Sequence, residues 1–331
     1  AAAGRQLSVL FLLGLFDAPA PDRAVAALRQ AGFTSGPLAE AMQADEIAFE
    51  DAVEALADQG LVSETSAGLD AHPLVRSFFA QRFREIDEAA YRAAHSALYD
   101  HYRFEGLPAA FRDPVAYGVL ALRCAYERDH YPTLRKGFLD GSLSEGLRDQ
   151  MPPSIAKLRP EQLQTAFERV DGPQFETAKT RFLPEDEAGM APLFAAIAHG
   201  CAAGRVTEAW REVHRPRVAQ GNEDFAAHKL GLYGPELAAL ARFFTAPFTA
   251  PSGGLSPADQ ALMLAHAGFR LRALGRLTDA VAPIGVAAQL PIATGEFERA
   301  SAGFGNLNEL LLVLGRIGGV AGDLASLDWA G

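Results

Sequence analysis

A short motif recurs in the C-terminal half of the chain and limits the folds that are possible there. Residues 202–209 read AAGRVTEA, residues 273–280 read ALGRLTDA, and residues 313–317 read VLGRI. The glycines of the three copies are 71 and 40 residues apart. Because each copy joins two Ala-rich segments with helical periodicity, the repetition predicts stacked pairs of antiparallel helices.

The first interval is about two periods of a tetratricopeptide-like repeat. A predicted helix at Tyr233–Phe244 lies where the intermediate unit is expected. Gly275 falls at a predicted turn and Ala280 at a predicted helix crossing, where we expect a larger side chain to push the two helices apart. Repeats of this kind bury their apolar faces by stacking, so the pattern also predicts a concave groove for a ligand.

Helical periodicity extends to the N-terminal part of the chain, where apolar residues recur every three or four positions. It covers Arg5–Phe16, Arg23–Ala31, Ala48–Ala57 and Pro73–Phe83. Residues 60–71 differ, because their turn residues predict a short β-hairpin. The order of helices, hairpin and helix is typical of a winged-helix domain. We therefore predict an all-α chain with a winged-helix domain at residues 1–84, a helical linker or insert at 85–184 and tetratricopeptide-like repeats at 185–331.

Charge and cysteine usage restrict the partners and the compartment. The net charge is −11, which repels phosphate backbones and anionic lipids, so we expect neither nucleic acid nor a membrane as partner. Cys124 and Cys201 are far apart in apolar segments, which indicates a reducing, cytoplasmic setting. The apolar run Leu7–Phe16 is too short to span a bilayer. The chain opens on Ala1 and stops at Gly331 as another hairpin begins, so we expect it to be part of a longer protein.

Residues 69–79 read LDAHPLVRSFF, at the junction of the predicted hairpin and the next helix. With the elements around it, this segment resembles the winged-helix end of the nucleotide-binding region in STAND ATPases, the NB-ARC and NACHT regulators of immunity and cell death. The repeat region is similar to the tetratricopeptide arrays that follow in bacterial members. The likeness covers the first 84 residues and roughly 185–314, whereas residues 104–180 match nothing in that family.

The resemblance implies a role for His72. In that family a histidine at this position contacts the phosphates of ADP and holds the protein closed; an Asp often follows it, whereas this chain has Pro73. The resemblance also implies that ADP or ATP lies on an upstream nucleotide-binding domain, and that no cofactor binds this segment. A protein or peptide trigger would bind the repeats, and opening would permit oligomerisation and switch on an effector, with a role in defence against phage.

Recognisable catalytic motifs are missing from the sequence. No Gly-x-x-x-x-Gly-Lys-Ser/Thr occurs, and no zinc-protease helix, Gly-x-Ser-x-Gly turn or clustered Cys and His ligands are present. His95 and His101 are six residues apart and lie on nearly opposite helix faces. His214 and His266 read as isolated packing or surface residues. We therefore predict a segment with no catalytic residues and no metal site.

A second hypothesis is a stand-alone scaffold that binds peptides in the groove of the repeats. Arginines would suit an acidic or carboxylate-ended ligand. The candidate partner-binding residues are Arg205, Arg211, Arg215 and Arg276. Arg270 and Arg272 cannot both face one groove, because they are two residues apart on a predicted helix.

Two further alternatives have less support from the residues. A winged-helix transcription regulator is disfavoured, because the helix before the hairpin has six acidic residues and no Lys or Arg between Asp45 and Gln59. An enzyme would need a site within residues 104–180 that the sequence does not reveal.

Overall fold

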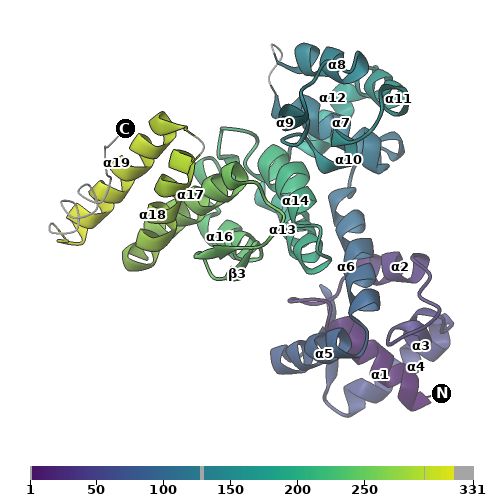
Figure 1. Ribbon diagram of the computed structural model, residues 1–331. Helices are drawn as coiled ribbons and strands as arrows, with labels where there is room; N and C mark the ends of the chain where they lie inside the picture. The colour runs from purple at the N-terminus through teal and green to yellow at the C-terminus, as the bar shows by residue number, and fades with distance from the viewer. Residues whose placement is uncertain (1, 127–129, 294, 317–331) are drawn as a thin grey trace. The chain divides into compact units, whose positions relative to one another are not determined.

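The computed structural model describes residues 2–126, 130–293 and 295–316. The described chain is mostly helical with a few short strands, which confirms the coarse prediction of an all-α fold. It forms two compact units, shown in Figure 1. One contains Ala1–Glu105 and Ala198–Arg205, the other Gly106–Ile197 and Val206–Gly331. The predicted winged-helix domain (residues 1–84), helical insert (85–184) and repeats (185–331) are not tested by this division and stay predictions.

The first unit consists of helices around a small hairpin. Its elements are α1 (Ala2–Leu13), α2 (Asp22–Gln30), α3 (Ala39–Met42), α4 (Glu46–Asp58), β1 (Val62–Thr65), β2 (Gly68–Ala71), α5 (Pro73–Ile86) and α6 (Glu88–Arg103). Each of the four N-terminal periodic segments forms a helix, as the spacing predicts. The Asp45 carboxylate accepts a hydrogen bond from the Ala48 amide, 2.8 Å away, and so caps the start of α4.

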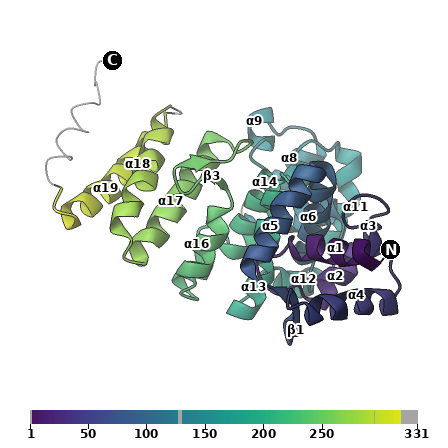
Figure 2. The same cartoon turned by 90° about the horizontal axis from the view of Figure 1, so that it is seen from below.

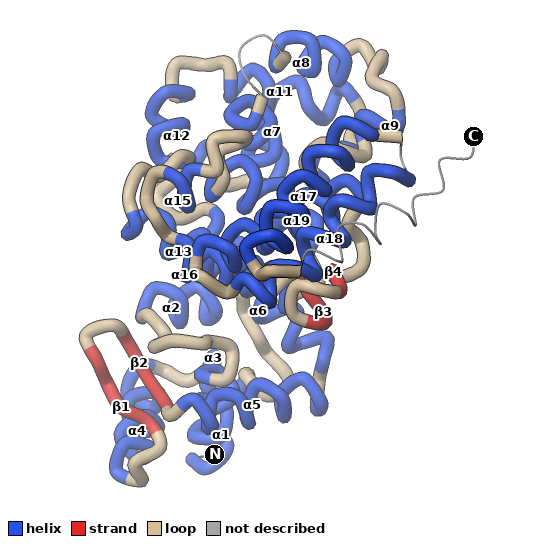
Figure 3. Tube along the Cα trace, turned by 90° about the vertical axis from the view of Figure 1, so that its left-hand side faces the viewer, coloured by secondary structure: helices blue, strands red, loops and turns tan. Residues whose placement is uncertain are grey.

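The hairpin lies where the turn residues predicted it. β1 and β2 are antiparallel with Val62 opposite Ala71, and Figure 3 shows them in red. Ala20 forms an isolated bridge to Leu69 through two backbone hydrogen bonds of 2.7 and 3.1 Å. This second pairing gives β2 backbone partners on both sides and holds the start of α5 in a fixed place.

Aromatic packing between α1 and α5 forms the core beside the hairpin. The ring of Phe11 meets Phe79 edge-on at 5.4 Å and Phe83 at 5.7 Å. Val9, Leu12 and Phe83 are fully buried. Burial of aromatic and aliphatic side chains of this size stabilises a fold by about 1.5–3 kcal/mol each, so α5 is anchored firmly along this face.

The second unit begins with short helices and continues into longer helical pairs. Its elements are a 3₁₀ turn η1 (Ala109–Phe111), α7 (Pro114–Ala125), α8 (Tyr131–Leu139), α9 (Glu145–Arg148), α10 (Pro153–Ala156), α11 (Pro160–Val170), α12 (Phe175–Phe182), most of α13 (Glu187–Ala202), α14 (Val206–Glu208), η2 (Ala209–Val218), α15 (Phe225–His228), α16 (Tyr233–Ala241), β3 (Phe244–Ala246), β4 (Ala250–Pro251), α17 (Pro257–Ala273), α18 (Leu277–Ala293) and α19 (Phe297–Val313).

Helices α17, α18 and α19 lie side by side, as Figures 1 and 2 show. Gly275 ends α17 with a φ of +75°, and a Cβ there would meet nothing within 4 Å. Gly275 thus lies at the predicted turn, but the expectation that a larger side chain there would push the helices apart is wrong; the left-handed backbone of the turn requires the glycine. Close approach occurs instead at Gly303, where a Cβ would lie 2.8 Å from the Cα of Ala288.

The segment η2 is π-helical over Ala209–Val218. Pro216 lies inside it, and a proline has no N–H to donate and clashes with the carbonyl four residues earlier. The wider turn accommodates this, and the Ala219 amide donates to the His214 carbonyl at 2.8 Å, five residues back.

Candidate functional site

His72 caps α5 and is exposed to solvent. Its Nδ1 accepts a hydrogen bond from the backbone amide of Leu74, 3.2 Å away. Because an accepting Nδ1 carries no proton, the proton of the neutral ring lies on Nε2. The capping role thus leaves Nε2–H as a donor on an exposed ring. Pro73 occupies the first helical position, where the amide hydrogen that proline lacks would have no partner within the helix.

An apolar face adjoins His72 on the same helix. Leu74 and Phe78 are 73% and 61% exposed, and a spacing of four residues places them on one side of α5. Arg76 forms an ion pair with Asp70 of β2. The start of α5 therefore combines an imidazole donor with uncovered apolar surface.

Two of the predicted partner-binding arginines are paired with acidic residues close by. In the first unit, Arg205 Nη1 lies 3.0 Å from Asp100 Oδ1 and 3.1 Å from Ser96 Oγ. In the second unit, Arg276 lies 2.9 Å from Asp279 across an exposed pair. Exposed pairs of this kind stabilise a protein by at most about 1 kcal/mol, so Arg276 can exchange partners at little cost.

The other two predicted arginines lie on η2. Arg211 is largely buried and makes contacts of 2.9 and 2.6 Å with Asp259, whereas Arg215 is half-buried. The four arginines of the prediction thus belong to two different units, and the structure does not collect them on one surface of either unit. Their role in partner binding stays a prediction.

A groove of about 620 Å³ lies between α17 and α19 with α18 at its floor. Small side chains line much of it: Ala258, Ala261, Ala265, Ala273, Ala287, Ala302 and Gly303. Phe269 and Leu262 add larger apolar surface, and Asn306 adds an amide. A volume of this size suits the side chains of a short peptide or a small ligand.

Charged side chains mark the ends of this groove. Arg272 lies 3.2 Å from Glu309, and Arg299 lies 2.7 Å from Glu296, both on the exposed side. Arg272 lines the groove, whereas Arg270 is 1% exposed and points elsewhere. This confirms the expectation that Arg270 and Arg272 cannot serve one groove.

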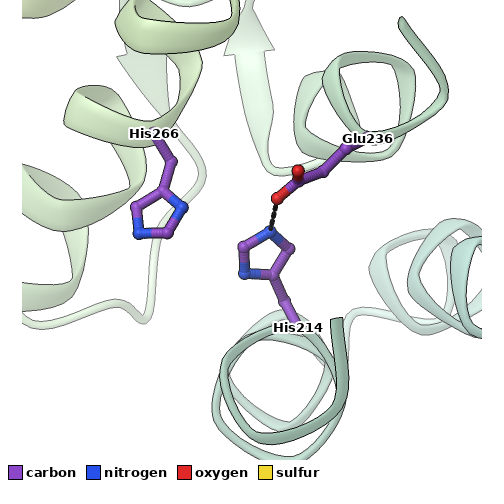
Figure 4. A group of neighbouring side chains, drawn as sticks. All are labelled: His214, Glu236 and His266. Atoms are coloured by element: carbon purple, nitrogen blue, oxygen red, sulfur yellow. Dashed lines mark hydrogen bonds and ion pairs between the residues drawn. The ribbon is translucent and has the colours of Figure 1, made fainter. Parts of the chain in front are cut away.

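A buried cluster of ionisable side chains forms where η2, α16 and α17 meet (Figure 4). His214 of η2, Glu236 of α16 and His266 of α17 face one another, and His214 Nε2 lies 3.1 Å from Glu236 Oε1. One nitrogen of each histidine and one carboxylate oxygen all lie within 4.8 Å of one another. His214 and Glu236 are fully buried, and His266 is nearly so.

Arg270 and Asp224 complete the cluster. Arg270 Nη2 lies 2.8 Å from Glu236 Oε1, and its Nε lies 3.1 Å from Oε2. The same Nη2 also pairs with Asp224, whose Oδ1 lies 3.3 Å from His266 Nδ1. Asp224 has a φ of +52°, which an aspartate tolerates better than most residues. Two carboxylates therefore face one guanidinium and two imidazoles.

The cluster perturbs the pKa of its members. Burial lowers the pKa of His214 to about 4, and the nearby Glu236 carboxylate opposes that effect only in part. Burial alone would raise the pKa of Asp224, but hydrogen bonds from His266 and Arg270 outweigh it and hold the pKa well below its usual range. The pKa of Glu236 is lowered in the same way, since His214 and Arg270 outweigh the effect of burial. Such perturbed groups are concentrated at functional sites.

His214 and His266 look isolated in the sequence, but they lie together in the folded chain. Their separation of 52 residues, with Glu236 between them, matches no local ligand spacing. The sequence offers one indication of this site: Pro216 lies inside an otherwise helical pattern, which predicts an irregular helix next to His214. By contrast, His95 of α6 meets His199 rather than His101, with their Nδ1 atoms 2.8 Å apart.

Comparisons with protein-family models, with curated proteins and with solved structures found no match for this chain. Within the described residues, every helix is too short or too polar to cross a membrane. The function therefore has to be inferred from the sites themselves.

Proposed function

We propose that this chain is a non-catalytic regulatory segment of a cytoplasmic STAND ATPase, in which His72 helps to retain ADP on an upstream nucleotide-binding domain. The observation that carries the proposal is the exposed His72 ring, whose Nδ1 is engaged in capping while Nε2–H remains a donor. The motif at residues 69–79 and the helix–hairpin–helix order of a winged-helix domain support it.

The energy of such a contact suits a latch. A hydrogen bond to a charged group contributes about 1.5–3 kcal/mol, and the N-terminus of a 14-residue helix such as α5 adds favourable charge for an anion. Loss of the contact would weaken ADP binding by roughly ten- to a hundredfold. A trigger that prefers the open form would then shift the population toward it.

The exposed face of α5 supplies the second half of this proposal. Leu74 and Phe78 would pack against the upstream domain in the closed form and become uncovered in the open form. Uncovered apolar surface beside the nucleotide would favour association between copies of the protein, which fits oligomerisation on activation.

The groove between α17 and α19 would receive the trigger in tetratricopeptide-like fashion. The alanines on its sides leave room for apolar side chains, and Arg272 and Arg299 at its ends would bind carboxylates. We propose a peptide segment of a partner protein with apolar side chains flanked by acidic groups. Nucleic acid and membranes would not be partners, because the chain carries a net charge of −11.

Nucleotide content tests the main proposal. The protein purified from its natural reading frame should contain close to one ADP per chain, measured by chromatography after denaturation. His72→Ala should reduce that content strongly, whereas His130→Ala, a change at another exposed histidine, should not. Wild-type protein without nucleotide, or equal content in both variants, would reject the proposed latch.

The groove favours a second candidate function, a stand-alone peptide-binding scaffold. To test it, a library of acidic peptides with free ends would be selected for binding to the wild-type chain. Ala265→Trp should fill the groove and weaken the selected peptides at least tenfold, whereas Ser301→Trp, an exposed position of α19 outside the groove, should leave binding unchanged. Failure to enrich any peptide would remove this candidate.

A further inference from the structure

The buried cluster at η2, α16 and α17 has more negative than positive charge. Asp224 and Glu236 face one guanidinium, that of Arg270, and the remaining members are imidazoles. The neighbouring pair of Arg211 and Asp259 balances itself and supplies no spare cation. Uncompensated buried charge costs several kcal/mol, so the second carboxylate needs a positive partner, which a protonated imidazole or a bound metal ion would supply.

His214 is fully buried, and the nitrogen that it turns toward the cluster is Nε2, 3.1 Å from Glu236 Oε1. A metal ion shared with Glu236 would bind this nitrogen. The flat stacking of Trp210 on the His214 ring, with centroids 4.6 Å apart and planes at 13°, fixes the ring in this orientation.

We propose that His214, Glu236 and His266 form a binding site for a transition-metal dication, with Zn²⁺ the metal that best suits this donor set. Two imidazoles and one carboxylate are a familiar zinc ligand set, whereas Ca²⁺ and Mg²⁺ prefer oxygen ligands. The three ligands come from η2, α16 and α17, so a bound metal would join three separate elements of the second unit.

The geometry requires a modest contraction. Ligands bound at about 2.0–2.1 Å in a tetrahedron lie about 3.4 Å from one another, whereas the candidate atoms here lie within 4.8 Å. Figure 4 shows the three side chains reaching toward one space from different helices. Rotation of His266, which is 14% exposed and the least enclosed of the three, would shorten the longest separation.

Arg270 is compatible with a metal only as an outer partner. Its Nη2 would leave Glu236 Oε1 to the metal and stay with Asp224, while its Nε would keep Oε2 at 3.1 Å. Ligating carboxylates are commonly held by such outer hydrogen bonds. Asp224 would do the same for His266 once the ring has turned to bind the metal through Nε2, which leaves Nδ1 to Asp224 Oδ1, 3.3 Å away.

Cobalt and zinc binding to the full chain test this site. We would remove metals with a chelator, titrate Co²⁺ while recording visible absorption, and then displace it with Zn²⁺. The expected result is one ion per chain with the intense absorption of tetrahedral Co²⁺. His214→Ala should abolish the band, and Asp224→Asn should weaken binding about 10- to 100-fold through loss of the outer hydrogen bond.

Two controls separate this site from unspecific binding and from misfolding. His130→Ala removes an exposed histidine far along the chain and should leave the titration unchanged. Circular dichroism of each metal-free variant shows whether it is folded, and Glu236→Gln, which nearly keeps the shape of the side chain, replaces His214→Ala if that variant unfolds. A wild-type chain that binds less than a tenth of an equivalent, or equal loss in His130→Ala, would overturn the proposal.

Discussion

Asp259 Oδ1 accepts a hydrogen bond of 2.9 Å from Trp210 Nε1, with both side chains buried. Its Oδ2 accepts from the Nε and Nη2 of Arg211 at 2.9 and 2.6 Å. One carboxylate at the start of α17 thus satisfies an indole and a guanidinium of η2. This side chain helps to hold the π-helical segment against α17, together with the ring contact of His214 with His266.

Asp259→Ala should therefore destabilise the protein by about 3–5 kcal/mol, because it leaves an indole N–H unpaired and takes the carboxylate away from a nearly buried guanidinium, which then keeps neutral acceptors alone. Urea unfolding followed by circular dichroism measures the free energy. Asp279→Ala is the matched control, since it breaks the exposed pair with Arg276 and should cost less than about 1 kcal/mol. Equal losses would show that Asp259 is not a tie between η2 and α17.

Two glycines of α19 should respond to alanine in opposite directions. A Cβ at Gly303 would lie 2.8 Å from Ala288, so Gly303→Ala should cost about 1–3 kcal/mol through overpacking. A Cβ at Gly305 would meet nothing within 4 Å, so Gly305→Ala should stabilise the helix by about 0.5–1 kcal/mol. Thermal unfolding of both variants compares them directly, and a common sign would contradict the packing of α18 on α19.

The turn after α17 tests backbone conformation alone, because a side chain at Gly275 would not be crowded by its neighbours. Gly275→Ala should cost about 1–2 kcal/mol, because its φ of +75° is unfavourable for a residue with a Cβ although space is available. Gly275→Asn should lose less, since asparagine tolerates this conformation better. Chemical unfolding distinguishes the two, and equal stability of wild type and both variants would argue against a left-handed turn.

Stability should fall at alkaline pH through buried tyrosines. Burial raises the pKa of Tyr102 to about 12, so the neutral form is favoured when the protein is folded. Its contribution is complete below the unfolded value near pH 10 and is lost as the pH rises from about 10 to 12, by about 3 kcal/mol at most. Burial also raises the pKa of Tyr126 and of Tyr131, which adds to the loss.

Urea unfolding at a series of pH values measures this loss, and the absorbance of ionised tyrosine at each pH reports which form is present. Tyr102→Phe removes one titrating group and should flatten the decline between pH 10 and 12 without abolishing it. A decline of equal slope in the variant would place the alkaline sensitivity elsewhere.

The sequence by itself determined the N-terminal helices, the first hairpin and the turn after α17, because these depend on local spacing. It did not reveal β3 and β4, and the helix predicted over Tyr233–Phe244 ends at Ala241. Apolar residues every three or four positions specify helix faces, and turn residues between Gly60 and Ala71 specify a hairpin. The Gly275-Arg276 turn joins α17 to α18 as the repeat predicts, whereas α19 begins at Phe297, after Gly295 and Glu296. The divergence of Arg270 and Arg272 was also predictable, since a two-residue step on a helix turns the side chain to another face.

Only the tertiary structure decided which distant side chains meet. His214, Glu236 and His266 come from three elements, and no local period links positions 22 and 30 residues apart. The same holds for Arg211, an apparent surface arginine that packing turns toward Asp259, and for Gly303, whose need for a small side chain comes from Ala288 of the neighbouring helix. Periodicity reports which face of a helix is buried, whereas the identity of the partner depends on how helices cross, and that is set by packing across the whole unit.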